Sequence, residues 1–319
     1  MPRIILKLLL LTVSLLLVAC GADSSIDPVQ EGEPAEEQVT QRLAPESDFT
    51  YEYEPLENLL VEDAGRFEVV ETDDDTGNDF TDTATGGIYE ILSIEGTTDT
   101  MSVDAWERML SWRSNAVLLA EQHRDSVILN MNPAENVVYL TFDDGPDSVN
   151  TVSVINTLLE YDVSATFFFT GENIRRHSDV VKKAHDAGFS LGLHGYSHKS
   201  FRDLSADEIV FELNETNDLL ENITGERSTI MRPPYGAMGD EEISIISNMN
   251  LTIYLWSLDT LDWAQTDADE ILRNVKQFLR PGEIILMHAF SGQRLVPEIL
   301  PAIIEFIRAE GFEMKALPQ

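Results

Sequence analysis

The stretch Thr141–Phe142–Asp143–Asp144–Gly145–Pro146 decides the fold and marks one site in the chain. It follows the apolar run 137–140, which is typical of a buried strand, and its Gly-Pro pair predicts a sharp turn. Two adjacent carboxylates at the end of a buried strand are costly, because each raises the pKa of the other. The pair therefore indicates a bound cation, a catalytic task or simply an exposed loop.

Apolar runs and helical segments alternate from residue 137 to the C-terminus. We expect strands at 137–142, 165–170, 190–194, 229–232, 251–257, 283–288 and, more weakly, 312–316, and helices at 149–161, 173–187, 205–223, 240–248, 268–279 and 295–309. Ser205 and Glu208 form a capping-box pattern, and Gly225 is placed to end that helix. Such repeats predict an α/β fold with a parallel sheet covered on both faces. About seven units within 131–319 favour a distorted (β/α) barrel over an open doubly wound sheet.

Polar residues follow several of these strands at their carboxyl ends, which meet at one face of a β/α barrel. Asp143 and Asp144 follow the first strand, and His194 and His198 follow the third. Two such histidines point the same way if the segment turns helically, and with one carboxylate they form a common ligand set for a catalytic divalent metal. The histidine spacing alone also fits structural or surface histidines, but its place beside the paired aspartates favours the metal.

Further strand ends carry candidate catalytic groups. Arg232 lies beside Pro233 and is expected in a rigid, partly buried site, where a guanidinium needs a carboxylate partner. The following proline pair fixes the direction of the Tyr235 backbone N–H, which suits an oxyanion donor. His288 ends an apolar strand, so it is either a satisfied core histidine or a proton donor oriented by Asp262.

Five segments, in this order, resemble the motifs of the NodB-homology polysaccharide deacetylases, carbohydrate esterase family 4. They are 141–146, 194–198, 232–236, 259–263 and 286–288. The resemblance covers roughly residues 135–319 and implies a NodB-like barrel. The second motif departs from the usual pattern, since Leu193 stands where Asn is common and Gly195 where Ser or Thr is common. Both histidines are retained, so the departures bear on substrate orientation more than on metal binding.

The resemblance also implies a role for each matching residue. A divalent metal, zinc most often or cobalt, would be bound by Asp144, His194 and His198. The catalytic base would be Asp143, positioned by Arg232, and the catalytic acid would be His288, tuned by Asp262. Trp263 and Leu286 would line the pocket for the acetyl methyl group, and the backbone N–H of Tyr235 would assist the metal at the oxyanion.

The expected activity is therefore metal-dependent hydrolysis of N-acetyl groups from a GlcNAc-containing polysaccharide, with release of acetate. Peptidoglycan is the first candidate polymer, followed by chitin-type oligosaccharides and exopolysaccharide. One alternative is O-deacetylation of an acetylated polysaccharide such as xylan. Another is a non-catalytic cell-wall-binding lipoprotein, which would be expected to lack Asp143 or His288, and both are present.

Composition excludes several other functions. The chain has 319 residues and a net charge of −36, which argues against nucleic-acid binding and against electrostatic docking on anionic lipid. A hydrophobic content of 43% supports a sizeable core. The one cysteine, Cys20, excludes an intramolecular disulfide and a cysteine-based zinc site.

The N-terminus resembles the signal of a bacterial lipoprotein. A basic start and the apolar run 8–17 precede the sequence LVAC at 17–20, which is similar to a lipobox. Removal of the signal peptide 1–19 would leave a lipidated Cys20 and an acidic, disordered tether over 20–50. The alternatives are an uncleaved membrane anchor and an ordinary secretory signal. We expect an extracytoplasmic protein that is lipid-anchored to the cell membrane through Cys20.

The region 51–130 is an accessory region whose fold the sequence leaves open. It combines strand-like patches with acidic and Gly/Thr-rich stretches, and a helix is expected from 103 to 122. Trp106 and Trp112 on this helix would pack against the main domain or, less simply, offer a platform for stacking a sugar ring.

Overall fold

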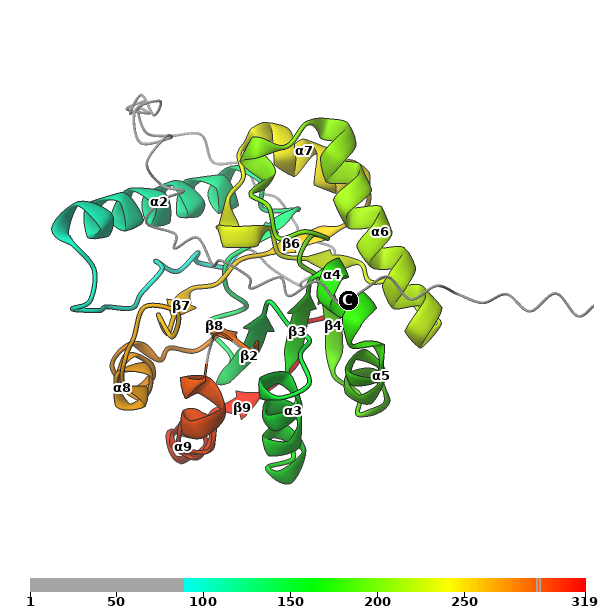
Figure 1. Cartoon of the computed structure of the whole chain (residues 1–319). Helices are drawn as coiled ribbons and strands as arrows, with labels where there is room; N and C mark the ends of the chain where they lie inside the picture. Colours follow the sequence, from blue (N-terminus) through cyan, green and yellow to red (C-terminus); the bar gives the residue numbers. More distant parts are fainter. Residues whose placement is uncertain (1–88, 291, 293) are drawn as a thin grey trace, which may run out of the picture. The chain divides into compact units, whose positions relative to one another are not determined.

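The protein is built around one parallel β-sheet. The computed structural model describes residues 89–290, 292 and 294–319. Within these residues the strands run in the order β1-β6-β5-β4-β3-β2-β8-β7, and β9 pairs with the start of β2 (Figure 1). Their bounds are β1 Val127–Ile128, β2 Val137–Asp143, β3 Thr166–Phe169, β4 Ser190–Leu193, β5 Ile230–Met231, β6 Thr252–Tyr254, β7 Leu258–Asp259, β8 Ile284–His288 and β9 Glu313–Met314.

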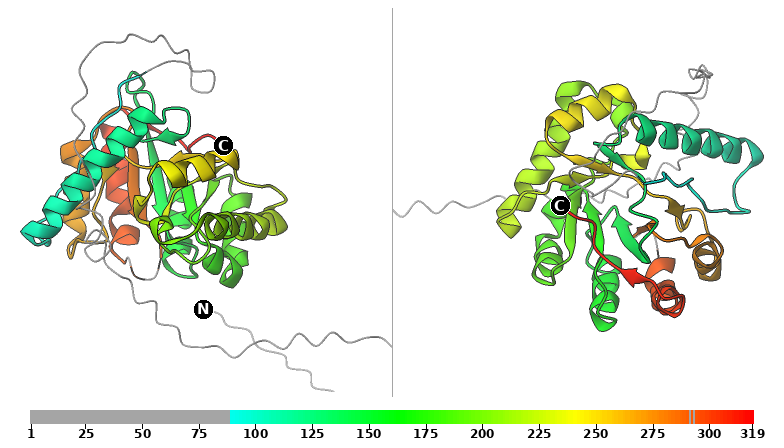
Figure 2. Two further views of the ribbon diagram at one scale, coloured as in Figure 1. Left: turned by 90° about the horizontal axis from the view of Figure 1, so that it is seen from above. Right: turned by 180° about the vertical axis from the view of Figure 1, so that it is seen from behind.

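Helices surround the strands on the outside, as Figures 1 and 2 show. They are α2 Val103–Gln122, α3 Asn150–Glu160, α4 Gly171–Arg176, α5 Ser178–Asp186, α6 Ala206–Thr224, α7 Asp240–Asn248, α8 Ala268–Phe278 and α9 Leu295–Ala309. Short 3₁₀ turns occupy Phe201–Asp203 and Pro234–Gly236. Because helices cover the sheet, every residue of β2, β3 and β8 is buried. The predicted α/β fold, a distorted barrel of parallel strands, is confirmed.

Local signals in the sequence also match the structure. Ser205 and Glu208 form the predicted capping box of α6, with the Ser205 backbone N–H 2.8 Å from the Glu208 carboxylate. Gly225 ends that helix in the left-handed region, at φ 84°. The helix expected at 173–187 is instead two helices, α4 and α5, because the chain turns at His177, whose φ and ψ are −132° and 47°.

Of the predicted strand 251–257, only 252–254 forms a strand, β6; the chain then crosses to the other side of the sheet, where β7 begins at Leu258. β6 pairs with β1 and β5, whereas β7 pairs with β8. The three residues between them, 255–257, carry the chain across, so that the Leu255 N–H bonds to Ile128 and the Ser257 N–H bonds to Ile284. The apolar run predicted burial correctly, but burial does not say which strand is the neighbour. We call 255–257 the crossover; it distorts the barrel next to the site.

The described part of the accessory region, 89–130, belongs to the same sheet and core. β1 joins the sheet beside β6, and Glu95 bridges Leu258 of β7. Side chains from this region enter the common hydrophobic core, among them Ile94, Ala116 and Leu119. Helix α2 has the bounds expected for it and begins at a Ser102 cap. These residues therefore extend the barrel domain.

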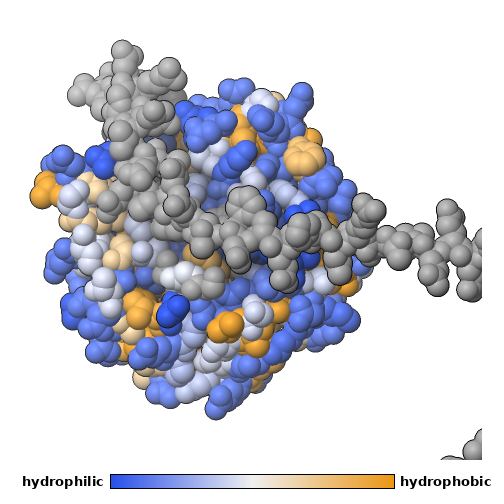
Figure 3. Space-filling model, in the orientation of Figure 1, coloured by the Kyte–Doolittle hydropathy of each residue, from blue (hydrophilic) through white to orange (hydrophobic). Residues whose placement is uncertain are grey.

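Other predictions lie outside the described residues and stay predictions: the signal peptide 1–19, Cys20 with the tether 20–50, and any structure in 51–88. No helix within the described ranges is long and apolar enough to cross a bilayer. The coloured face in Figure 3 is mainly hydrophilic, with apolar residues in separate small patches, as expected for so acidic a chain.

Candidate active site

A cleft opens at the carboxyl ends of the strands. Its lining consists of acidic, imidazole and large apolar side chains, namely Asp143, Asp144, His194, His198, Tyr235, Trp256, Trp263, Leu286 and His288. All except Trp256 are residues that the sequence singled out. The remaining two predicted site residues, Arg232 and Asp262, lie directly behind this lining and bond to it. Residues up to 145 positions apart in the chain thus share one site.

Asp143 is held by a fully buried arginine. Arg232 donates from Nη1 to Asp143 Oδ1 at 2.8 Å and to Thr141 Oγ1 at 2.9 Å. Its Nε and Nη2 donate to the carbonyls of Tyr254 and Leu255, at 2.9 and 2.7 Å. Burial works to lower the pKa of Arg232, and the charge of Asp143 opposes that change. Since a guanidinium stays protonated in proteins, the result is a rigid buried ion pair.

Asp144, His194 and His198 bring three possible ligand atoms together. Asp144 Oδ1 lies 3.2 Å from Nε2 of His194 and 2.9 Å from Nε2 of His198. The ligand atoms of this buried triad all lie within 4.8 Å of one another. His194 Nδ1 is 2.8 Å from the carbonyl oxygen of Arg232. A carbonyl only accepts, so Nδ1 carries the proton and Nε2 keeps its lone pair for a ligand.

The fit of a metal ion to this triad rests on one orphaned atom. Asp144 Oδ1 is buried and, among the described residues, has no hydrogen bond of good geometry, although two imidazole nitrogens lie nearby. Burial works to raise the pKa of Asp144, but His198 and His194 outweigh it and hold the pKa well below its usual range. One carboxylate and two imidazole nitrogens are a donor set that suits a divalent ion such as zinc.

The loop between the two histidines is held from behind by a residue that the sequence analysis missed. Glu212 of α6 accepts from the backbone N–H groups of Tyr196 and Ser197, at 2.6 and 2.8 Å, and from the Ser197 hydroxyl at 2.6 Å. Gly195 has φ +69°, and a Cβ there would lie 3.3 Å from Glu212 Oε2. Glycine at this position is therefore explained by the left-handed turn and the close carboxylate.

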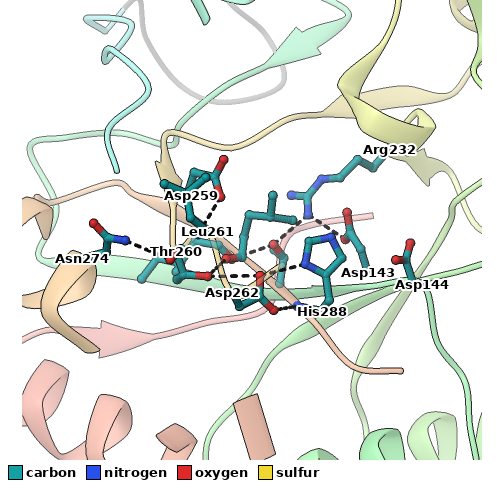
Figure 4. Close-up of polar contacts among 12 residues, drawn as sticks. Asp143, Asp144, Arg232, Asp259, Thr260, Leu261, Asp262, Asn274 and His288 are labelled. Atoms are coloured by element: carbon teal, nitrogen blue, oxygen red, sulfur yellow. Dashed lines mark hydrogen bonds and ion pairs between the residues drawn. The ribbon is translucent and has the colours of Figure 1, made fainter. Parts of the chain in front are cut away.

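On the other side of the cleft, the Asp262 carboxylate makes two contacts with His288. Its Oδ2 accepts from the His288 backbone N–H at 2.8 Å, and its Oδ1 lies 2.9 Å from Nδ1 (Figure 4). Burial works to lower the pKa of His288, but the nearby carboxylates, Asp262 first and then Asp144 and Asp143, together outweigh it and the pKa rises to about 10. Because Nδ1 faces a carboxylate, Nε2 is the nitrogen left to exchange a proton with a substrate.

The apolar part of the cleft is formed by Trp256, Trp263, Leu286 and Tyr235. Tyr235 has φ 62° and its ring lies 4.7 Å from that of His198, edge to face. Trp256 was missed by the sequence analysis, although it stands at the end of the predicted strand 251–257. It stacks on Trp112 of α2, with ring centroids 5.1 Å apart. Trp112 thus packs against the main domain, the first of the two interpretations considered for it.

Known proteins are similar to this chain in sequence and in fold. The family model for polysaccharide deacetylases matches residues 130–254. A peptidoglycan-N-acetylglucosamine deacetylase of Bacillus cereus is 35% identical over 189 residues, which cover 59% of this chain and 68% of that protein. The crystal structure of the Bc1960 peptidoglycan N-acetylglucosamine deacetylase is similar with a TM-score of 0.61 and 30% identity, over 63% of this chain and 95% of that one.

A non-catalytic relative is also similar. The structure of a carbohydrate esterase family 4 pseudoenzyme from Bacillus anthracis matches with a TM-score of 0.57 and 29% identity, over 60% of this chain and 67% of that one. The fold alone therefore does not settle activity, which depends on the side chains in the cleft. An imidazole–carboxylate pair, a carboxylate–guanidinium pair and a buried Asp-His-His triad share one cleft. Together with 35% identity to a relative over 68% of that relative's length, they show that the chain belongs to the polysaccharide deacetylase family of hydrolases.

Proposed function

We propose that this chain is a metal-dependent deacetylase that hydrolyses N-acetyl groups of a GlcNAc-containing polysaccharide, with peptidoglycan as the first candidate. One observation carries the proposal: Asp143 held by Arg232 and His288 held by Asp262 face the same cleft as the triad of Asp144, His194 and His198. The peptidoglycan deacetylases among its relatives support the choice of polymer.

The triad would hold the metal, with zinc as the ion we favour because of its nitrogen and oxygen donors. When bound, a divalent ion supplies Lewis acidity that polarises a carbonyl and lowers the pKa of water. Asp143 is placed to accept the proton of the attacking water, because Arg232 keeps one of its oxygens occupied and fixes the direction of the other. The backbone N–H of Tyr235 would stabilise the oxyanion that forms.

His288 would complete the reaction as the acid. It gives the proton on Nε2 to the departing nitrogen as the carbon–nitrogen bond breaks, so that one water and one acetamide become acetate and a free amine. Asp262 stabilises the protonated imidazole needed for that step. Trp263 and Leu286 line the part of the cleft where an acetyl methyl group would be enclosed.

The test is acetate release by the purified chain after chelation and after addition of Zn²⁺ or Co²⁺. We expect chelated protein to be inactive and the added ion to restore release from peptidoglycan. His198→Gln should abolish both activity and stoichiometric zinc binding, whereas His185→Gln, on α5, should change neither. Acetate released only from an O-acetylated polymer such as xylan would favour the alternative activity, and zinc binding with no release from any polymer would favour a non-catalytic wall-binding protein.

The pH dependence of the reaction should report the contact between Asp262 and His288. Since Asp262 raises the pKa of His288, the acid stays protonated to higher pH, and the reaction is lost only as pH rises through that pKa. In Asp262→Asn the pKa falls, so the alkaline limb of kcat/KM should move to lower pH. A pH–rate profile measures this shift. Asp267→Asn, which alters an exposed cap of α8, should leave the limb in place.

We also propose that the protein is extracytoplasmic and lipid-anchored through Cys20. The lipobox-like sequence at 17–20 supports this, and a tether over 20–50 would give the cleft access to the cell wall. In cells, Cys20→Ser should move the protein from the membrane fraction to the medium or leave its signal uncleaved. An unchanged membrane fraction with a cleaved signal would contradict the anchor.

A further inference from the structure

Asp259 is a buried carboxylate that the proposed chemistry does not use. It is 1% exposed, at the end of β7, three residues before Asp262. Its Oδ1 accepts the backbone N–H of Leu261 at 2.9 Å, and Leu261 has φ 55°, in the left-handed region (Figure 4). A left-handed leucine is strained, so the turn needs such a bond to persist. The turn directs Asp262 toward His288.

A single cation from outside the motifs pairs with this carboxylate in the described part of the chain. Arg113 of α2 places Nη2 3.8 Å from Asp259 Oδ2, and the two side chains are 7% and 1% exposed. Arg113 also donates from Nη1 to the carbonyl of Gly96 at 2.9 Å and stacks over Trp106 at 5.2 Å. Burial works to raise the pKa of Asp259, and Arg113 opposes that rise. The pair is close enough for strong attraction in a dry interior.

The N-terminal segment is fitted around Asp259 in other ways. The Asp259 backbone N–H donates to the carbonyl of Glu95 at 2.8 Å. Gly96 approaches so closely that a Cβ there would lie 2.2 Å from the Asp259 carbonyl oxygen. Next to Arg113 on the same helix, Trp112 stacks on Trp256 in the cleft wall. Two neighbouring residues of α2 thus contact the structure behind the cleft, and α2 lies before the residues matched by the family model.

We infer that Arg113 is a positioning residue for the catalytic acid: by neutralising Asp259 it keeps the turn 259–262 in the conformation that aims Asp262 at His288. This inference rests on the proposed function for the role of His288, but the geometry it describes does not. Without Arg113, the buried Asp259 carboxylate loses the largest of the charge interactions that oppose the rise of its pKa, and it is stabilised by taking up a proton or by turning toward water. Either change weakens the bond to Leu261 and loosens the turn.

Substitution with charge compensation tests the inference. We expect Arg113→Gln to lower kcat for acetate release about tenfold with KM within twofold, as for a change in transition-state stabilisation. Adding Asp259→Asn removes the unpaired charge while the amide oxygen can still accept from Leu261, so the double variant should recover at least half of the wild-type kcat. A purely structural role of the Arg113 side chain, through Gly96 or Trp106, would not be rescued in this way.

Two controls sharpen the result. Arg124→Gln removes an exposed arginine that donates to the carbonyl of Tyr89, also in the N-terminal segment, and should leave kcat unchanged. In an Asp262→Asn background, Arg113→Gln should cost less than twofold further, because its effect passes through Asp262. Three results would each overturn the inference. One is a loss of kcat from Arg113→Gln that is as large in the Asp262→Asn background as in the wild type. The others are no rescue by Asp259→Asn and a wild-type kcat in Arg113→Gln.

A readout other than activity separates this inference from the proposed function. The Nδ1–H proton resonance of His288, observed by NMR, reports its hydrogen bond to Asp262. It should be lost or shifted upfield in Arg113→Gln and return in the double variant with Asp259→Asn. If the wild-type chain releases no acetate, the proposed function fails, and the resonance still decides the positioning role. If Arg113→Gln does not fold, Arg113→Lys, which keeps the charge, should fold and retain the resonance; its loss there would refute the inference.

Discussion

Asp143→Asn is expected to lower kcat for deacetylation by about 10²–10⁴-fold, the usual contribution of a general base. Asn has nearly the same shape and can still accept the bond from Arg232, but it cannot take a proton from water. Zinc binding should persist, because Asp144, His194 and His198 are unchanged. The measurement is acetate release under saturating substrate, combined with the zinc content of the purified variant.

A control for this experiment lies four residues along the chain. Asp147 accepts from the backbone N–H groups of Val149 and Thr151 and is not part of the cleft lining. Asn serves as well as Asp in such caps, so Asp147→Asn should retain nearly full activity. If Asp143→Asn kept its zinc and near-normal turnover, Asp143 would not be the base.

Arg232→Met is expected to have the largest effect on stability. It leaves the Asp143 carboxylate, which is 2% exposed, without its counter-charge and removes the donors to the carbonyls of Tyr254 and Leu255. Breaking a buried ion pair from one side typically costs about 3–5 kcal/mol. The free energy of unfolding, measured by urea denaturation, should fall by that amount, and acetate release should fall with it because the base is no longer held.

Arg227 provides the matching control, because its pairs with Asp218 and Glu221 are at the surface, with the arginine side chain 40% exposed. Exposed pairs contribute less than about 1 kcal/mol, so Arg227→Met should change the unfolding free energy little. Equal losses in the two variants would mean that the buried pair of Arg232 and Asp143 contributes no more than a surface pair.

The main parts of the site were predictable because parallel strands impose a simple geometry. In a barrel of this kind the carboxyl ends of all strands meet, so a polar residue at the end of each apolar run is directed to one face. Asp143 at the end of β2, His194 after β4 and His288 at the end of β8 were found in this way, and the structure places them around one cleft. Local caps, such as Ser205 with Glu208, depend only on neighbouring residues and were equally readable.

The features that were not predicted depend on contacts between elements distant in the chain, and neither hydrophobic periodicity nor a sequence motif encodes such contacts. Glu212 lies inside a helix, where a carboxylate normally faces solvent, and nothing in its surroundings indicates the loop at 195–197 that it holds. Arg113 lies in a region without strong strand signals and pairs with a residue 146 positions away. The change of partners at the crossover is hidden for the same reason, since nothing in the sequence of β6 or β7 says which strand each will pair with.

The crossover has a consequence for where an independent folding unit can begin. β1 pairs with the free edge of β6, and Glu95 forms a bridge to Leu258 of β7. The N-terminal residues therefore pair with the strands on both sides of the crossover. A fragment starting at residue 131 would bare the backbone of both strands as open edges, and open edges recruit strands from other molecules and promote aggregation. The smallest fragment that can be moved into a fusion protein therefore starts ahead of Ile94. A fusion that omits β1 and the segment around Glu95 is expected to aggregate.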